Sequence, residues 1–408
     1  GLPEGLLAGL PASRLQHEHA CVALQSSTRT VVPGEVASFG FFGRMLEDHP
    51  MASSPADLAW VDDTLALPQA QAPRLWPSSD RRLGADNASW FQTAPVLQAL
   101  DLEEAWCHHL FGAQRSHEER DGQGALLSWF ADDDRHVVLR AKELLVLRPH
   151  GHLLRGGQAL VPDESALTST VWMGGVFHSM LTQGHVSINR LLSTVHGYLG
   201  QFRSHGLRLF VQTTQGWQQL GTPSAFEMTP QACRWVYRNS QGLLMVRSAA
   251  EGGAMTLSLQ VLEGPALKWR ASLHVALGGD DGASAAPLCW QVTRQDEASI
   301  REVELRPAQG SEMALRFPQG CFVIEAVGSK GFTGVAGDEA LFLDGQSRGE
   351  PFLCLDGQAA PAFALRIIGR LIPHADVQAT EPLPQVRLLA PSGAVSTPLA
   401  AAASSILP

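Results

Sequence analysis

Lysine is scarce in this chain, and the cysteines are few and far apart. Only three of the 408 residues are lysine, and 30 Lys and Arg stand against 40 Asp and Glu, which leaves a formal net charge of −10. General binding to nucleic acids or anionic membranes needs basic faces, so the sequence predicts neither partner. The two nearest of the six cysteines, Cys289 and Cys321, are 32 residues apart. This spacing excludes zinc motifs and a dense disulfide framework, and it favours reduced, mostly buried thiols in a cytoplasmic protein.

Long apolar runs are also absent. Apolar segments such as residues 137–147 are interrupted by charges, here Arg140, Lys142 and Glu143, and none reaches the roughly 18 apolar residues of a membrane helix. The N-terminus carries Glu4 and no basic region before an apolar stretch, so it is not typical of a secretory signal. Because the chain begins at Gly1 without a methionine, we expect it to be part of a longer protein.

The common catalytic signatures are missing as well. The chain has no GxGxxG after a strand, no GxxxxGK[ST], no HExxH and no GxSxG. With 45% hydrophobic and 17% charged residues it has the composition of an ordinary globular protein, and its length suggests two or three domains. Composition and short motifs therefore assign no enzyme class.

Residues 1–50 predict short strands, and residues 51–112 predict a helical connector and linker. Short alternating segments at 20–24 and 35–42 flank a Pro-Gly turn, which is typical of β-structure. A helix should begin at Ser54, whose hydroxyl can cap it.

A second helix is predicted over residues 94–112. Apolar residues return there at helical spacing, and Gly112 is a natural helix stop. Residues 66–92, between the two helices, show no period and predict a linker.

Residues 113–372 predict antiparallel strands. Residues 256–261 and 268–275 alternate polar and apolar side chains and are joined by Glu263-Gly264-Pro265, which predicts a hairpin. Two further hairpins are expected around the glycine turns that end at Gly242 and Gly216. Several hairpins at near-regular spacing predict a large β-sandwich.

Two later segments are harder to assign or carry no element. Residues 184–202 follow a helical period with Ser187 as a possible cap, in the middle of a strand pattern, so their structure stays open. Residues 373–408 are rich in Pro and Ala and predict an exit linker.

Histidine is concentrated between residues 108 and 205, which hold ten of the fifteen. Imidazole, amide and guanidinium groups beside an exposed indole suit a sugar, whose ring has an apolar face and a rim of hydroxyls. One run supplies this mixture, with a platform at Trp172 and hydrogen-bonding groups in the candidate substrate-binding residues His178, Gln183, His185, Asn189 and Arg190. The alternative is that Trp172 and its apolar neighbours belong to the core and that the histidines satisfy strand ends.

Two other polar clusters have weaker functional interpretations. In His150-Gly151-His152 two histidines are separated by one residue, and this segment suits a metal or, with Arg148, an anion less well than it suits a solvated turn. The three aspartates at 132–134 predict a polar hairpin tip more readily than a calcium site, because no ordered ligand spacing follows.

Long phrases of the sequence resemble a known family. These are FADDDRHVVLRAKELLVLRPHGHLLRGG, LVPDESALTSTVWMGGVFHSMLTQGHVSINRLLSTVHGYLGQFRSHGLRLFVQ, LGTPSAFEMTPQACRWVYRN and LFLDGQSRGEPFLCL. They are similar to the glycoside hydrolase family 94 phosphorylases, in particular the 1,2-β-oligoglucan phosphorylase and cellobiose-phosphorylase-like group. The resemblance covers most of residues 30–370.

The resemblance implies a fold. It is mainly β: a large antiparallel β-supersandwich of the galactose-mutarotase-like kind over 113–372, preceded by a helical connector over 51–112 and by the tail of an upstream β-domain over 1–50. In the family an (α/α)6 barrel follows, so residues 373–408 would be the linker towards it. The resemblance also implies that residues 184–190 are strand-like.

The resemblance further implies an activity for the parent protein. It is inverting phosphorolysis of β-linked gluco-oligosaccharides to α-glucose 1-phosphate, with inorganic phosphate as co-substrate and no cofactor or metal. In the family the general acid and the phosphate-binding residues belong to the barrel, so no catalytic residue is assigned to this chain. Two alternatives are a stand-alone carbohydrate-binding or scaffolding β-protein, and a part of a cyclic β-1,2-glucan synthase.

Overall fold

The computed structural model describes most of the chain between residues 28 and 370. The chain falls into two compact units, Gly1–Gly84 and Ala85–Pro408. The described residues are 28–37, 40–41, 43–51, 54–71, 88–132, 134–146, 149–157, 166–184, 190–192, 206–275, 277, 289–297, 299–328 and 330–370. The predicted site residues His185 and Asn189 and the predicted linker 373–408 lie outside them.

The helices of the first unit lie within residues 55–71 of its described part. This segment contains a 3-10 helix η1 (Pro55–Leu58) and the helices α2 (Ala59–Leu65) and α3 (Pro68–Gln71). The predicted start at Ser54 is confirmed, because the Ala56 N–H donates to the Ser54 hydroxyl at 3.3 Å and the Ser54 N–H donates to Asp57 at 2.8 Å. The prediction of a strand over residues 35–42 is wrong for the described residues of that segment, because none of them is in a strand.

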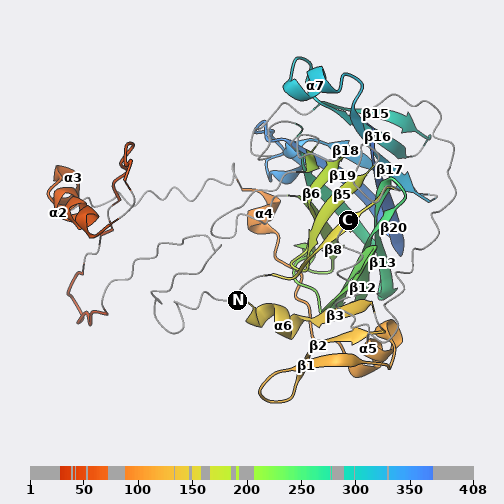
Figure 1. The fold of residues 1–408 in the computed structure, drawn as a ribbon, viewed down its shortest axis with the longest axis horizontal. Coiled ribbons are helices and arrows are strands. Elements are labelled where there is room, and N and C mark those ends of the chain that lie inside the picture. The colour runs from red at the N-terminus through yellow and green to blue at the C-terminus, as the bar shows by residue number, and fades with distance from the viewer. Residues whose placement is uncertain are drawn as a thin grey trace, which may run out of the picture. The chain divides into compact units, whose positions relative to one another are not determined.

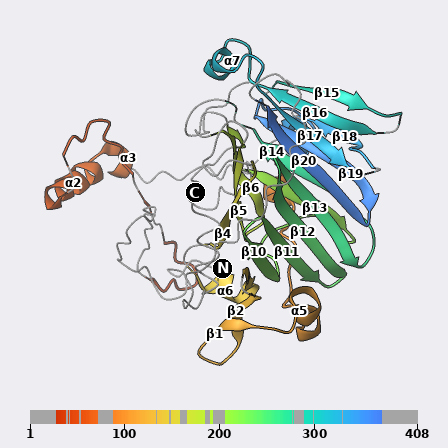
Figure 2. The same ribbon diagram turned by 45° about the vertical axis from the view of Figure 1, so that its right-hand side comes forward.

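The second unit is built on two antiparallel sheets, which face each other in Figures 1 and 2. The described strands of the larger, 11-stranded sheet are, in spatial order, β1 (Ser116–Arg120), β2 (Leu126–Ala131), β3 (Arg135–Leu139), β10 (Ala225–Thr229), β11 (Ala232–Asn239), β12 (Gly242–Glu251), β13 (Ala254–Glu263), β20 (Ala362–Arg370), β17 (Cys321–Val327), β16 (Ile300–Arg306) and β15 (Cys289–Gln295). The predicted antiparallel sandwich is confirmed.

The second sheet has nine strands within the described residues. Its order is β18 (Gly334–Ala336), β19 (Phe352–Ala360), β14 (Leu267–His274), β8 (Leu207–Thr213), β6 (Val176–Gln183), β5 (Leu167–Trp172) and β4 (Gly151–Arg155), with β7 (Arg190–Leu192) on β6 and β9 (Gly216–Gln219) on β8. The short helices of this unit are α4 (Trp90–Thr93), α5 (Glu104–Phe111), α6 (Arg140–Leu145), α7 (Glu312–Arg316) and the 3-10 helix η5 (Asp338–Leu341).

The predicted glycine hairpins β8–β9 and β11–β12 are present, but the hairpin predicted for residues 256–275 is wrong. Strand β13 pairs with β12 and β20 in the larger sheet, whereas β14 pairs with β8 and β19 in the smaller one. The connection at Gly264, whose φ is +111°, therefore carries the chain from one sheet to the other. Alternation predicts a strand and its buried face, but it does not specify which sheet supplies the neighbours.

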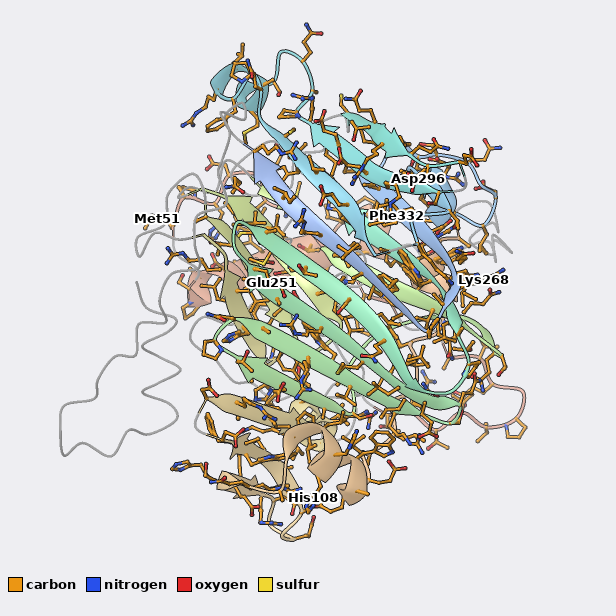
Figure 3. All side chains as sticks on the ribbon, turned by 90° about the vertical axis from the view of Figure 1, so that its right-hand side faces the viewer. Met51, His108, Glu251, Lys268, Asp296 and Phe332 are labelled. Carbon is orange, nitrogen blue, oxygen red and sulfur yellow. The ribbon has the colours of Figure 1, made fainter. Side chains whose placement is uncertain are left out.

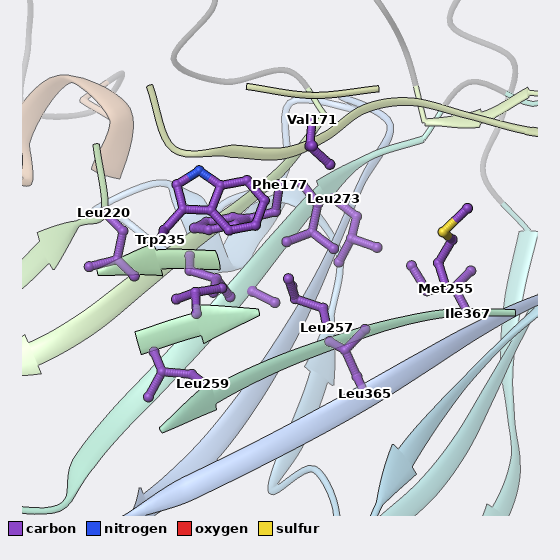
Figure 4. Close-up of a cluster of buried hydrophobic side chains, with 14 of the residues drawn as sticks. Val171, Phe177, Leu220, Trp235, Met255, Leu257, Leu259, Leu273, Leu365 and Ile367 are labelled. Carbon is purple, nitrogen blue, oxygen red and sulfur yellow. The ribbon is translucent and has the colours of Figure 1, made fainter. Parts of the chain in front are cut away.

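The core lies between the two sheets (Figure 4). Phe177 of the smaller sheet meets Trp235 of the larger one edge to face, with ring centroids 5.0 Å apart. Leu257 and Leu365 approach from the larger sheet, and Leu273 from the smaller; all are fully buried. Each such side chain contributes about 1.5–3 kcal/mol relative to exposure, so this layer is the main source of stability.

The helix predicted over 94–112 is shorter than expected. Residues 94–103 are not helical; Val96 bridges to Gln219 and Leu100 to Arg238, so this segment satisfies its backbone groups on strand edges instead. Helix α5 begins at Glu104 and ends as predicted at Gly112, whose φ is +86° and whose N–H donates to the His108 carbonyl at 2.9 Å.

The predicted linker 66–92 also differs, because it contains α3 and most of α4. Ser89 and Gln92 form a capping box at the start of α4, and Trp90 and Phe91 of this helix both contact Phe210 of β8. The sequence left residues 184–202 open between helix and strand. The described residues 190–192 of this segment form strand β7, so the helical interpretation fails there.

The described cysteines are free thiols. Cys107, Cys233, Cys321 and Cys354 are buried, and Cys289 is exposed. Burial raises the pKa of the Cys107 thiol to about 11. Among the described residues, the helices are all too short or too polar to cross a lipid bilayer.

Candidate functional site

Three of the predicted sugar-facing residues, Trp172, His178 and Gln183, lie on the β5–β6 hairpin, which contains an irregularity. Trp172 pairs with Val176 and Thr170 with Met180, so β6 carries extra residues between these two pairs. A bulge of this kind interrupts the alternation of side chains. As a result Phe177 and His178, neighbours in sequence, are both fully buried, and Ser179 is left to face Trp172.

Trp172 lies half-buried and in a fixed orientation. Its indole N–H donates to the Ser179 hydroxyl at 3.0 Å, and its carbonyl accepts from the indole N–H of Trp235 at 3.1 Å. Its ring packs against Gly151 of β4 so closely that a Cβ there would lie 2.5 Å from the ring. The edge and one side of the indole are therefore held by the protein, and the accessible part of the ring has a defined position.

His178 lies inside the sandwich, where it links the two sheets. Its Nδ1 is 2.5 Å from the Ser169 hydroxyl, and its Nε2 is 3.3 Å from the hydroxyl of Ser248 on β12. Because the Ser169 hydroxyl donates to the Met180 carbonyl at 2.8 Å, it accepts from Nδ1, which makes Ser248 the donor to Nε2. Burial lowers the pKa of His178 to about 3. In this position the imidazole is a neutral core group, and no atom of it faces a sugar.

Of the remaining predicted residues, Gln183 does not join Trp172 on one surface. Gln183 is also interior, because a Cβ at Gly369 of β20 would lie 2.1 Å from its Oε1. Arg190 begins β7, and His185 and Asn189 lie outside the described residues. Their predicted contact with a sugar stays a prediction.

The other histidines of this region make separate contacts. The Nδ1 of His150 is 2.5 Å from Glu143, and the Nε2 of His152 donates to the Thr229 carbonyl at 2.9 Å. Within the described part of the chain, no group of three or more His, Cys, Asp or Glu is placed to hold a metal ion. Asp132 forms the predicted polar tip between β2 and β3, with a φ of 60° and an ion pair to Arg135 at 2.9 Å.

A group of side chains that the sequence pattern did not reveal lies on the outer face of the smaller sheet. Trp90 of α4 contacts Trp217 of β9 with ring centroids 4.9 Å apart, and the Arg270 guanidinium lies 4.2 Å from the centre of the Trp90 ring. Arg270 in turn pairs with both carboxylate oxygens of Asp356, at 2.6 and 2.8 Å. The only local signal for Trp90 was the capping box around it, in a stretch otherwise typical of a linker.

Comparisons with known proteins agree with this architecture. Residues 113–369 match the family model of the glycoside phosphorylase supersandwich domain. The chain is 25% identical over 313 residues to a 1,2-beta-oligoglucan phosphorylase of Listeria innocua, and the match covers 76% of this chain and 26% of that protein. The chain thus spans about a quarter of the length of this relative.

Solved structures resemble the chain at low identity. A galactose mutarotase related enzyme from Lactobacillus acidophilus matches 54% of this chain and 97% of its own, with 7% identity and a TM-score of 0.34. A polysaccharide lyase matches 52% of this chain and 33% of its own, with 9% identity and a TM-score of 0.31.

Proposed function

The chain belongs to the glycoside phosphorylase supersandwich family, and from this premise we propose that it is the sandwich portion of an enzyme that phosphorolyses β-linked gluco-oligosaccharides. The similarity to a 1,2-beta-oligoglucan phosphorylase supports this substrate class. The portion supports a catalytic (α/α)6 barrel of the same parent chain and contributes to the rim of its sugar cleft. The cytoplasmic location expected from the sequence stays a prediction.

The proposed reaction is inverting phosphorolysis. A carboxylic acid protonates the glycosidic oxygen while inorganic phosphate attacks the anomeric carbon from the opposite side, where an inverting hydrolase would place water. The C–O bond to the leaving sugar breaks, its oxygen keeps the proton, and α-glucose 1-phosphate forms. The acid and the phosphate-binding groups belong to the barrel in this proposal, so this chain alone has no activity.

Trp172 is the observation that carries a sugar-binding role for the sandwich. Its orientation is held by Ser179 and by the close approach of Gly151, so no rotamer has to be ordered when a pyranose ring stacks on it. We therefore expect Trp172 to contact the oligosaccharide outside the bond that is cleaved.

The test is Trp172→Ala in the complete enzyme. We expect kcat/KM for oligosaccharide to fall by roughly 2- to 10-fold, because a stacking contact contributes about 0.5–1.5 kcal/mol. Trp172→Phe should recover most of the loss. Trp60→Ala, which removes a tryptophan that is 40% exposed in the first unit, is the matched control. Release of α-glucose 1-phosphate measures the rate, and an unchanged kcat/KM for Trp172→Ala would remove this residue from the site.

A further inference from the structure

Three chemically different side chains form one row across the outer face of the smaller sheet. Gln212 of β8 pairs with Trp217 of β9 on one side and with Lys268 of β14 on the other. Residues directly opposite each other in a sheet share a face. The adjacent residues Val211 and Trp269 belong to the core, so the row faces away from it. Lys268 lies at the margin of the unit in Figure 3.

The aromatic end of the row is held firmly. Trp217 is half-buried against Trp90, and Trp90 in turn lies on the guanidinium of Arg270. Because Asp356 holds that guanidinium through two hydrogen bonds, the two indoles have little freedom to move. Trp217 therefore offers a preorganised, half-buried apolar ring at the surface.

The polar end of the row is available for a ligand. Lys268 is exposed and Gln212 is half-buried. Within the described residues, neither the Lys268 ammonium nor the Gln212 side-chain amide takes part in a hydrogen bond or an ion pair. Together the two groups supply ammonium donors and both an amide donor and an amide acceptor.

The hairpin that carries Trp172 adjoins the segment that follows β9, the strand of Trp217. The turn of that hairpin approaches the residues that directly follow β9, since a Cβ at Gly175 would lie 2.3 Å from the Leu220 carbonyl and 2.8 Å from the Cα of Gly221. Gly175 has a φ of +82°, which favours glycine in so close an approach. Trp172 at one end and Trp217 at the other are thus presented by adjoining segments of the same sheet.

We propose that the row of Trp217, Gln212 and Lys268 binds one glucose unit of a β-linked gluco-oligosaccharide whose other units contact Trp172. The apolar face of the pyranose packs on the indole of Trp217, and its hydroxyl rim receives hydrogen bonds from the amide and the ammonium. This assignment rests on the proposed function, because it takes the substrate class from there. It extends the sugar-binding surface of the sandwich along the sheet.

The test compares matched lysine and glutamine variants of the 408-residue chain. Lys268→Ala and Gln212→Ala remove groups of the row, whereas Lys330→Ala and Gln358→Ala remove exposed residues at a different seam of the sandwich. The probes are β-1,2-linked gluco-oligosaccharides of increasing length, titrated calorimetrically. We expect each row variant to weaken the binding of the long oligosaccharides by roughly 2- to 10-fold, the value of one hydrogen bond, and the controls to leave it unchanged.

The outcomes separate this inference from the proposed function. If Trp172→Ala weakens binding and neither row variant does, the row is not a sugar site and the proposed function stands. If the row variants weaken binding and Trp172→Ala does not, the row is a sugar site and the role of Trp172 fails. No binding of any oligosaccharide overturns the sugar-binding roles of both the row and Trp172, and preferential binding of inorganic phosphate at Lys268 overturns the assignment of a neutral sugar.

Discussion

The two sheets share one core but differ on their outer faces. The outer face of the 11-stranded sheet, turned towards the viewer in Figure 3, is covered by α5 at one end, where Phe111 packs on Trp129. Over β20 and β17 it is a polar surface with ion pairs between neighbouring strands, such as Arg366 with Glu325 at 2.6 Å. The outer face of the 9-stranded sheet is covered by chain: Phe91 of α4 and Leu341 of η5 pack on Phe352 and Cys354. The outer side of β20 and β17 is thus a solvated wall, whereas the outer side of β19 is a covered face on which other segments pack.

This difference shows where sequence changes should matter. An ion pair on the solvated wall exchanges water contacts for a screened attraction, and its net value is small. A charge on the covered face is held among aromatic rings and carbonyl groups, and its loss leaves a partner in poor solvation. The expected effects below follow this contrast from the largest to the smallest.

The largest effect should follow removal of residues 85–112, which pack on both sheets of the sandwich. The family domain begins at residue 113, yet Leu97 and Ala99 belong to the core between the sheets, and Cys107 and Phe111 pack with Trp129. We expect a chain starting at residue 113 to be less stable than one starting at residue 85 by about 5 kcal/mol or more, from the summed burial of these side chains and of α4. Urea midpoints measure the difference, and equal midpoints would show that residues 85–112 are dispensable.

A smaller effect is expected for Arg270→Ala. The guanidinium joins Asp356, the Ala340 carbonyl and the Trp90 ring, so its removal loosens α4 and η5 together. Because Asp356 stays about one-third exposed and can be rehydrated, we expect a loss of about 2–3 kcal/mol, below the full cost of breaking a buried pair. Thermal unfolding measures the change, and Arg270→Lys should not restore the bidentate contact.

A comparable effect should appear with pH at the interface between the sheets. Burial lowers the pKa of His178 to about 3, against 6.5 when the chain is unfolded, so the unfolded state takes up the proton first. The stabilisation is complete above about pH 6.5 and is lost as the pH falls from there towards 3; we expect a loss of about 2–3 kcal/mol between pH 7 and pH 4.5.

Urea titrations of the wild type and of His178→Gln at these two pH values measure this loss. The variant should be less stable at pH 7 and should lose less stability on acidification. His108→Gln, a change at an exposed histidine of α5, is the control and should keep the wild-type slope. The same slope for wild type and His178→Gln would contradict the linkage.

The smallest effect is expected on the solvated wall. Arg366→Ala removes the ion pair to Glu325, but the Arg366 side chain is 46% exposed. We expect a loss between 0 and about 1 kcal/mol, reduced further by salt. A loss as large as that of Arg270→Ala would remove the contrast between the two faces.

Local sequence signals identified much of the sandwich. The glycine at 242 predicted a turn from the sequence alone. The structure adds a second reason for glycine there, because a Cβ would lie 2.0 Å from the Glu263 carbonyl. The cap at Ser54 and the stop at Gly112 were equally local, since their hydrogen bonds join residues within four positions of each other. The resemblance predicted a strand-like segment over residues 184–190, where periodicity alone favoured a helix; Arg190 begins β7, and residues 185–189 lie outside the described residues.

The candidate site was less predictable. The alternation of a regular strand would have put His178 on the face opposite Phe177, and the bulge in β6 turned both inward. Nothing in the run around Trp172 reveals that bulge, because it is a property of how β6 pairs with β5 and β8. No local pattern marks Trp90 or Lys268 as surface site residues. Trp90 meets Trp217 only because α4 docks on the sheet, and Lys268 meets Gln212 only through the pairing of β14 with β8.

The sequence by itself determined the mainly β class, the positions of most turns and caps, and the family. These depend on backbone conformation and on hydrogen bonds between near neighbours, which a short segment specifies alone. Only the tertiary structure decided which sheet β13 and β14 join, that His178 bridges the sheets, and that Trp172 and Trp217 lie on the outer face. Those outcomes depend on contacts between residues far apart in the chain, whose free energy exists only once the two sheets have packed.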